Sequence, residues 1–419
     1  MKRILVVGGG GREHAIVWKL RQSQQVSEIY CAPGNAGIAG IAECLPIKVN
    51  EMDEMVKAAL DLRIDLVIVA PDDPLAAGMV DIMTAAGLRA FGPTKSAARL
   101  ESSKVFSKGL MRKYGIPTAG YKTFTDYEKA IVYLKTSEYP IFIKADGLAL
   151  GKGAVMAAGF DEAADIVEDM MKGDSYGVSG RNVVIEEYMT GPEVTVLAFA
   201  DGKSVKPMVS SQDHKRALDD DMGLNTGGMG AIAPSLHYDK DMAERCMRTI
   251  FKPTMNALHS EGIEFKGVIY FQLMLTPTGP KVIEYNARFG DPEAQAVLPL
   301  LKTDLCEIFE SIIDGDLEKM NIEWSGQSSA CVVMASGGYP AKYATGFEIC
   351  GMSDAEKTGA IIFHAGTRME NGAYVTSGGR VLGVTAVSDS LESALAKSYE
   401  AVKMIDFQDA HYRKDIGRH

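Results

Sequence analysis

Short apolar runs alternate with longer amphipathic segments over the first hundred positions of the chain. Segments such as 52–62 have the 3.6-residue period of a helix, whereas the apolar runs have the length of buried strands. The runs lie at residues 4–7, 28–32, 45–49, 65–70 and 88–91. Because strands that alternate with helices form parallel sheets, this pattern predicts a doubly wound parallel α/β sheet.

The middle of the chain begins with a helical period over residues 97–114, which ends at Gly115 and Pro117. Short apolar strands follow, and a late pair at residues 268–275 and 281–285 is separated by the turn sequence Thr-Pro-Thr-Gly-Pro. If that hairpin closes symmetrically about Thr278, Gln272 lies across from Glu284. The other expected strands lie at residues 139–144, 154–157, 183–189 and 194–200.

The last part of the chain predicts a small α+β domain. Strand patterns at residues 330–335, 360–365 and 379–387 precede a helical pattern at 391–404. We therefore expect an α/β and α+β multidomain protein. Its predicted domains are an N-terminal domain at residues 1–103, a central domain at 104–316 and a C-terminal domain at 326–419.

Composition narrows the classes of function. A length of 419 residues predicts several domains, and the net charge of −11 argues against nucleic acid as a partner. The six cysteines include no Cys-x-x-Cys pair, which favours a reducing compartment over disulfides or structural zinc. With no signal peptide and no apolar run of membrane-spanning length, we expect a cytoplasmic protein without a membrane partner. We expect a monomer.

A run of four glycines follows the first predicted strand. Its spacing does not fit a nicotinamide-binding fingerprint, because Glu13 or His14 stands where the third glycine should pack closely. A glycine turn at a helix N-terminus still offers free N–H groups and a positive dipole end. The turn therefore predicts an anion site.

A second glycine-rich loop lies between two predicted strands. Lys144 ends the first strand, and the sequence Asp-Gly-Leu-Ala-Leu-Gly-Lys-Gly153 follows. Gly147 and Gly151 are too close for a Walker A motif, and the next element is a strand. A glycine hairpin can instead fold over a triphosphate, with Lys152 and the backbone N–H groups against its oxygens.

Two further segments suit a nucleotide. An apolar strand that runs through Glu186, Glu187 and Tyr188 into a short linker could hold an adenine, and Glu193 could accept from ribose hydroxyls. The sequence Gln-Asp-His-Lys-Arg216 is dense in charge and predicts a loop that holds carboxylate or phosphate.

The late strand at residues 281–285 carries the candidate metal ligands. Alternation along a strand places Glu284 and Asn286 on one face and Tyr285 on the other. A carboxylate and an amide oxygen side by side suit a hard divalent cation. Arg288, Asp291 and Glu293 follow and suit a polar substrate.

Together these segments resemble the ATP-grasp enzymes, and in detail the glycinamide ribonucleotide synthetase family. The similarity runs nearly end to end and is carried by Gly-Gly-Arg-Glu-His-Ala15, Pro-Gly-Asn-Ala-Gly37, Phe-Gly-Pro-Thr94, Lys-Ala-Asp-Gly-Leu148, Asp-His-Lys-Arg216, Asn-Thr-Gly-Gly-Met-Gly230, Arg-Phe-Gly-Asp-Pro-Glu293 and Arg-Lys-Asp-Ile-Gly417. Three positions depart from the pattern. Gly10 stands where the family usually has Ser, Asp72 where it usually has Glu, and Gln272 where other ATP-grasp enzymes often carry an acid.

The resemblance implies a central ATP-grasp domain with a mobile lid at about residues 122–190. It implies ATP-driven condensation of glycine with 5-phosphoribosylamine through glycyl phosphate, an early step of purine biosynthesis, with Mg²⁺ or Mn²⁺ as cofactor. The implied catalytic residues are Arg288, Lys144 and Asp213, and the implied metal ligands are Glu284 and Asn286. The implied ATP-binding residues are Lys104, Lys144, Gly147, Gly151, Lys152, Gly153, Glu186, Glu187, Tyr188 and Glu193. The implied substrate-binding residues are Gly9, Gly10, Gly11, Arg12, Asn35, Asp213, Lys215, Arg288, Asp291 and Glu293.

Three alternatives stay open at this point. One is another ATP-grasp ligase or a carboxylating enzyme of the same superfamily, which would need bicarbonate. The others are a nicotinamide-binding oxidoreductase and a nucleotide sensor without catalysis.

Overall fold

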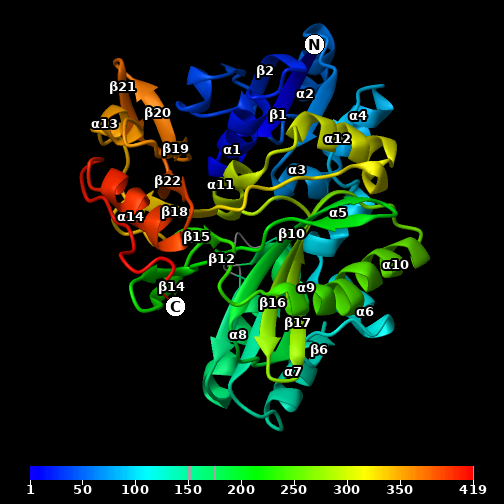
Figure 1. Ribbon diagram of the computed structural model, residues 1–419. Helices are drawn as coiled ribbons and strands as arrows, with labels where there is room; N and C mark the ends of the chain where they lie inside the picture. The colour runs from blue at the N-terminus through cyan, green and yellow to red at the C-terminus, as the bar shows by residue number, and fades with distance from the viewer. Residues whose placement is uncertain (149–152, 174–175, 419) are drawn as a thin grey trace.

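The computed structural model describes residues 1–148, 153–173 and 176–418 (Figure 1). Its N-terminal sheet is parallel, in the order β3-β2-β1-β4-β5, and confirms the doubly wound prediction. The predicted strand at 45–49 is wrong, because the pairing along β2 ends after two residues of β3. The strands are β1 Lys2–Gly8, β2 Val26–Pro33, β3 Glu43–Cys44, β4 Leu66–Val69 and β5 Ala90–Phe91, and the helices are α1 Gly11–Leu20, α2 Met52–Asp61, α3 Asp72–Ala77 and α4 Met79–Ala85.

The single helix predicted at 97–114 is in fact two helices. Ser103 interrupts it in extended conformation, and its hydroxyl accepts a hydrogen bond from Phe106 N at 3.1 Å. Serine is a favoured N-cap because its side chain satisfies one of the unpaired N–H groups of the first turn. The helices are α5 Lys95–Ser102 and α6 Lys104–Lys113.

Two antiparallel sheets make up the middle of the molecule. The first, at the foot of Figure 1, has the order β6-β9-β7-β8, and its side chains form a hydrophobic core of their own with α7 and α8. The second has the order β11-β10-β16-β17 and packs on α6, α9 and α10. The elements of the first are β6 Tyr121–Phe124, β7 Ile141–Ala145, β8 Ala154–Ala157, β9 Val183–Glu187, α7 Tyr127–Leu134 and α8 Phe160–Lys172. Those of the second are β10 Glu193–Asp201, β11 Val205–Pro207, β16 Lys266–Thr276, β17 Gly279–Asn286, α9 Lys240–Cys246 and α10 Lys252–Ser260.

The hairpin of β16 and β17 contains a β-bulge. Gln272 pairs with Glu284 as predicted, but Leu273 pairs with Val282, so Ile283 is an extra residue. The hairpin is therefore not symmetric. A bulge reverses the face of the side chains beyond it, which lets Val282 enter the core while Glu284 turns toward the neighbouring sheet.

The C-terminal sheet has the order β12-β15-β18-β22-β19, and α14 packs on its two long strands. Two of its strands, β12 and β15, come from the middle of the chain, which the sequence pattern did not indicate. The bounds are β12 Gln212–Asp213, β15 Gly230–Ala233, β18 Ser328–Ala335, β19 Ile361–His364, β22 Arg380–Ser388 and α14 Leu391–Val402. Two small hairpins join β13 Arg216–Leu218 with β14 Met222–Asn225, and β20 Thr367–Glu370 with β21 Ala373–Thr376.

Buried polar contacts join the N-terminal and C-terminal domains. His14 Nδ1 accepts a hydrogen bond from His364 N at 2.8 Å, and Asn35 donates to His364 O at the same distance. Burial lowers the pKa of His14 to about 3 and that of His364 to about 4, so both rings are neutral packing groups. No helix within the described residues has both the length and the apolar character that crossing a membrane requires.

Candidate active site

Glu284 lies at the centre of a ring of cations. The positive side chains that act on it come from four separate segments of the chain, and their combined field outweighs burial and lowers the pKa of its carboxyl group. The ring consists of Lys215, Lys144, Lys104 and Arg288. Several fixed cations that come together at one place suit a polyphosphate.

Lys144, the lysine predicted at the end of a strand, forms an ion pair with Glu186. The Glu186 carboxylate lies 3.0 Å from Lys144 Nζ through one oxygen and 3.1 Å from Lys108 Nζ through the other. Both lysines are almost fully buried. Burial lowers the pKa of Lys108 to about 8 although Glu186 opposes it, whereas Glu186 and Glu284 together outweigh burial and raise the pKa of Lys144.

A ladder of polar side chains crosses the second sheet beside Glu284. Gln272, on β16, donates to Glu193 Oε2 at 2.7 Å and accepts from Lys215 Nζ at 2.9 Å. Glu193 and Gln272 thereby fix the Lys215 ammonium close to Glu284. Gln272 thus binds its neighbours through both ends of its amide.

Glu284 and Asn286 fit a hard divalent cation. Among the described residues the Glu284 carboxylate has no hydrogen-bond partner, and Asn286 uses its amide nitrogen on Tyr285 O at 3.0 Å, which leaves its oxygen free. Within the described part of the chain no three His, Cys, Asp or Glu side chains form a metal-binding group. Oxygen donors from two residues alone leave room for phosphate oxygens and water in the same shell.

A second group of charges surrounds Asp213. Among the described residues its Oδ1 is buried and has no hydrogen-bond partner, and burial together with Glu293 raises the pKa of its carboxyl group well above its usual range. Lys215 and Arg380 oppose this rise. Glu293 is itself buried and accepts a hydrogen bond from Tyr270 OH at 2.8 Å. Burial and the nearby Glu293 carboxylate therefore favour proton binding by Asp213.

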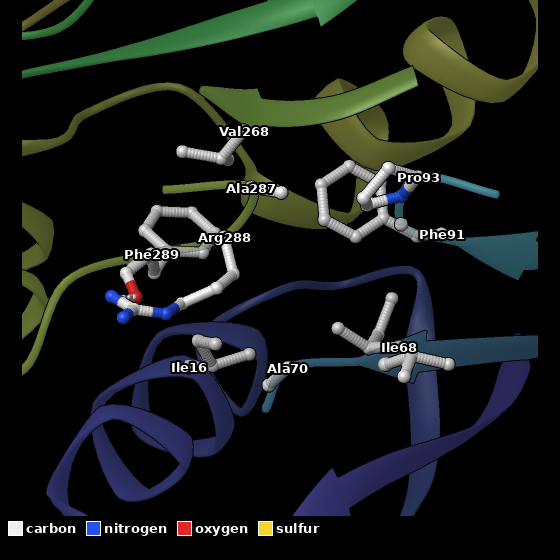
Figure 2. A pocket seen from close by; sticks show the side chains of 11 residues that line it. Ile16, Ile68, Ala70, Phe91, Pro93, Val268, Ala287, Arg288 and Phe289 are labelled. Carbon is white, nitrogen blue, oxygen red and sulfur yellow. Dashed lines mark hydrogen bonds between the residues drawn. The ribbon is translucent and has the colours of Figure 1, made fainter. Parts of the chain in front are cut away.

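Arg288 is fixed by Glu101 at the seam between the N-terminal and central domains. Glu101 Oε1 lies 2.8 Å from Arg288 Nη2, and its other oxygen accepts from Ala287 N at 2.7 Å. Figure 2 shows the Arg288 side chain extending over Ile16 of α1, beside a small and mostly apolar pocket. Burial works against the charge, but Glu101 and Asp72 outweigh it and raise the pKa of Arg288.

The N-terminal glycine turn contacts the segment after β17. Arg12 N, at the start of α1, donates to Asp291 Oδ2 at 3.3 Å, so a protein carboxylate lies at the helix end where we expected an outside anion. Gly9 faces Gly34 O so closely that a Cβ would lie 2.4 Å from it. Gly10 N donates to Glu13, and a Cβ on Gly11 would meet Gln295 at 2.4 Å.

Asn35, predicted to bind substrate, holds its own loop together. Its amide nitrogen donates to Gly9 O and His364 O, and its side-chain oxygen accepts from Gly37 N and Ile38 N. Both hydrogens and both lone pairs of the amide are therefore in use. The structure thus gives the Asn35 side chain a role in shaping the turn.

The sheet of β6 to β9, with the segments beside it, carries most of the predicted nucleotide residues. Lys104 Nζ donates to Gly147 O at 3.1 Å, and Gly153 O accepts from Ala145 N. Gly151 and Lys152 lie outside the described residues. Glu187 pairs with Lys281 at 2.8 Å, and the half-exposed Tyr188 stacks on Phe142.

Three site residues escaped the sequence reasoning. Lys108 could have been found, because it lies one turn after Lys104 on the same helix face. Glu101 and Arg380 gave no local signal, because each reaches the site from another domain. Arg380, on β22, lies 3.3 Å from Asp291 Oδ1 and also donates to Gly227 O at 2.9 Å.

Two antiparallel sheets with cations directed at one carboxylate between them are the arrangement of an ATP-grasp enzyme. The family model described as phosphoribosylglycinamide synthetase, ATP-grasp (A) domain, matches residues 102–294. The N-domain model of the same family matches residues 2–101, and the C-domain model matches 329–419. The chain belongs to the phosphoribosylglycinamide synthetase family.

Relatives of the whole chain support the assignment. A phosphoribosylamine–glycine ligase of Caldanaerobacter subterraneus is 49% identical over 99% of each chain. The trifunctional purine biosynthetic protein adenosine-3 of Gallus gallus is 47% identical, and the match covers 99% of this chain and 42% of that protein. The crystal structure of a phosphoribosylamine–glycine ligase from Thermotoga maritima has a TM-score of 0.86 at 30% identity, with 99% of each chain covered.

Proposed function

We propose that the protein joins glycine to 5-phosphoribosylamine at the expense of ATP and forms glycinamide ribonucleotide, ADP and phosphate. The family and the names of its relatives support this reaction. The observation that carries it is the ring of four cations around Glu284, which lies between the two antiparallel sheets. This ring has the charge needed to hold a triphosphate next to a carboxylate substrate.

The first step is phosphoryl transfer. A glycine carboxylate oxygen attacks the γ-phosphorus of ATP, the bond to the bridging oxygen breaks, and ADP leaves with glycyl phosphate formed. Two anions must approach each other, so the protein's work is charge neutralisation and alignment. Lys144, held by Glu186, and Lys215, held by Gln272, supply fixed positive charge that needs no reorganisation during the reaction.

The second step is acyl transfer. The amine of the ribosylamine attacks the carbonyl carbon of glycyl phosphate, phosphate leaves, and the new amide nitrogen must lose a proton. Asp213 is the candidate acceptor, because its Oδ1 is unpaired within the described residues and its raised pKa makes the carboxylate a stronger base. Arg288, oriented by Glu101, would lie against the leaving phosphate.

Glu284 and Asn286 would hold the metal ion, Mg²⁺ or Mn²⁺, and Glu193 would contact the nucleotide ribose. The ion, when bound, screens the charge of the phosphate oxygens and orients them. The charged Glu284 carboxylate is kept ready for it by its lysine neighbours, which lower its pKa.

The sheet of β6 to β9 is proposed to act as the lid, because it has a hydrophobic core separate from that of the second sheet. Closure would keep water from the acyl phosphate. We expect an ATP analogue to protect the segment at about residues 122–190 from limited proteolysis. Equal cleavage with and without the analogue would contradict closure.

The assay for the proposed function is coupled ADP release by the purified full chain. ADP release should require both glycine and ribosylamine and should continue when bicarbonate is omitted. Release that depends on bicarbonate and not on glycine would instead identify a carboxylating enzyme. ATP binding without turnover would identify a sensor, and tight NADH binding without ATP affinity would identify an oxidoreductase.

A further inference from the structure

The side chains of Asp213, His214 and Lys215 point in two directions, toward the active site and toward the C-terminal segment. The segment after β12 stays extended, since His214 N donates to Gly230 O at 2.9 Å and His214 O accepts from Met229 N at 2.8 Å. In an extended segment alternate side chains point to opposite sides. Asp213 and Lys215 therefore face the site, and His214 between them points away.

His214 points to the C-terminal segment at residues 411–417, which we name the tail. The ring is 4% exposed, and its Nε2 accepts a hydrogen bond from Gly417 N at 3.0 Å. An Nε2 that accepts from an N–H group must be unprotonated, so this contact requires the neutral ring.

The tail holds the same segment at further points. Arg413 is fully buried and donates to Arg216 O at 3.2 Å and to Asp221 Oδ1 at 2.7 Å. Asp415 forms two hydrogen bonds of 2.8 Å with the Arg413 guanidinium and accepts from Asp220 N. Further contacts join His411 Nε2 to Ala217 O and Lys414 N to Asp219 Oδ1.

We propose that the tail is a positioning element for the reaction, in which His214 and Arg413 hold the 213–217 segment so that Asp213 and Lys215 reach the substrates. The proposal rests on the proposed function and extends it to residues that touch neither substrate nor nucleotide. Its physical basis is that the tail contacts the face of the segment opposite the site, whereas on the site face Lys215 donates to Gln272. The loop at 226–230 holds its backbone, and the tail holds its far face.

The charges around His214 preserve the required neutral ring. Burial and, after it, Arg413 lower its pKa to about 4, against the opposing effects of Gly230 O, Asp221 and Asp415. Loss of Arg413 should therefore move the pKa of His214 up toward its ordinary value of 6.5. Below that new pKa the protonated ring cannot accept from Gly417 N.

The first test compares His214→Leu with His214→Gln in the full chain. Glutamine can accept from Gly417 N through its side-chain oxygen, whereas leucine cannot. We expect His214→Leu to lower kcat/KM for glycine and ribosylamine by about 10- to 100-fold, as loss of an orienting outer partner does elsewhere, with KM for ATP changed no more than about twofold. His214→Gln should restore most of the loss.

The second test is a pH profile of Arg413→Met against Arg413→Met with His214→Gln. In the single variant kcat/KM should fall as the pH drops from 6.5 toward 4. The double variant should show no such fall. Amide hydrogen exchange at residues 226–230 measures how firmly the 213–217 segment is held and does not depend on turnover. The exchange rate should rise in His214→Leu and not in His214→Gln.

The outcomes separate this proposal from the proposed function. A wild-type chain without glycine-dependent ADP release contradicts the function, while the exchange measurement still tests the positioning. An active wild type with equal kinetics or equal exchange in the leucine and glutamine variants overturns the positioning. If Arg413→Met does not fold, the two His214 variants decide.

Discussion

Replacing Glu284 with glutamine is expected to lower kcat by at least about 10²- to 10³-fold, the cost of losing one preorganised electrostatic contact. Glutamine keeps the size of the side chain and removes the charge that faces Lys144, Lys215 and Lys104. Because the carboxylate has no hydrogen-bond partner among the described residues, its loss leaves no protein donor unpaired. The fold should therefore survive.

The matched control is Glu261→Gln, which removes a carboxylate of the same domain from an exposed pair with Lys113. Such surface pairs contribute little, so kcat and melting temperature should stay close to those of the wild type. Titration calorimetry gives a second readout, in which Glu284→Gln should weaken the Mg²⁺-dependent part of ATP-analogue binding. An unchanged kcat in Glu284→Gln would refute the metal assignment.

The second large effect is expected at Arg288, where activity and stability can be separated. Arg288→Met removes a fixed cation and leaves Glu101 as a buried carboxylate without its partner. We expect a loss of about 3–5 kcal/mol in the free energy of unfolding from the unpaired charge. The loss in kcat/KM should be about 10²- to 10³-fold.

The double variant Arg288→Met with Glu101→Gln distinguishes the two losses. The neutral glutamine can still accept from Ala287 N, so most of the stability should return, while activity should stay low. Arg288→Lys should keep the charge and lose the fork geometry, with intermediate activity. Urea unfolding and the ADP-release assay measure both quantities. Wild-type kcat/KM in Arg288→Met would contradict the assignment of Arg288 to the site.

The sequence predicted local features well where one segment decides the outcome. The pairing of Gln272 with Glu284 and the common face of Glu284 and Asn286 followed from strand alternation and turn chemistry. The bulge at Ile283 did not, because it depends on whether Val282 enters a core built by distant helices. The break at Ser103 was readable in principle, since serine before a helical period is an N-cap signal.

The parts of the site that sequence could not predict are contacts between domains. The Asp291 carboxylate at the start of α1 joins segments 279 positions apart, and no local pattern records such a meeting. The same holds for Glu101 beside Arg288, for Arg380 beside Asp291 and for the addition of β12 and β15 to the C-terminal sheet. The similarity to a known family implied which residues form the catalytic site, but not which other side chains hold those residues in place.

The metal and phosphate sites are tested most directly by a crystal structure with a non-hydrolysable ATP analogue and Mn²⁺, whose anomalous signal locates the ion. We expect an ion bound to Glu284 and Asn286, with the analogue's phosphates between Lys144 and Lys215. Phosphates bound instead at the glycine turn of residues 8–11, with no ion at Asn286, would contradict this expectation.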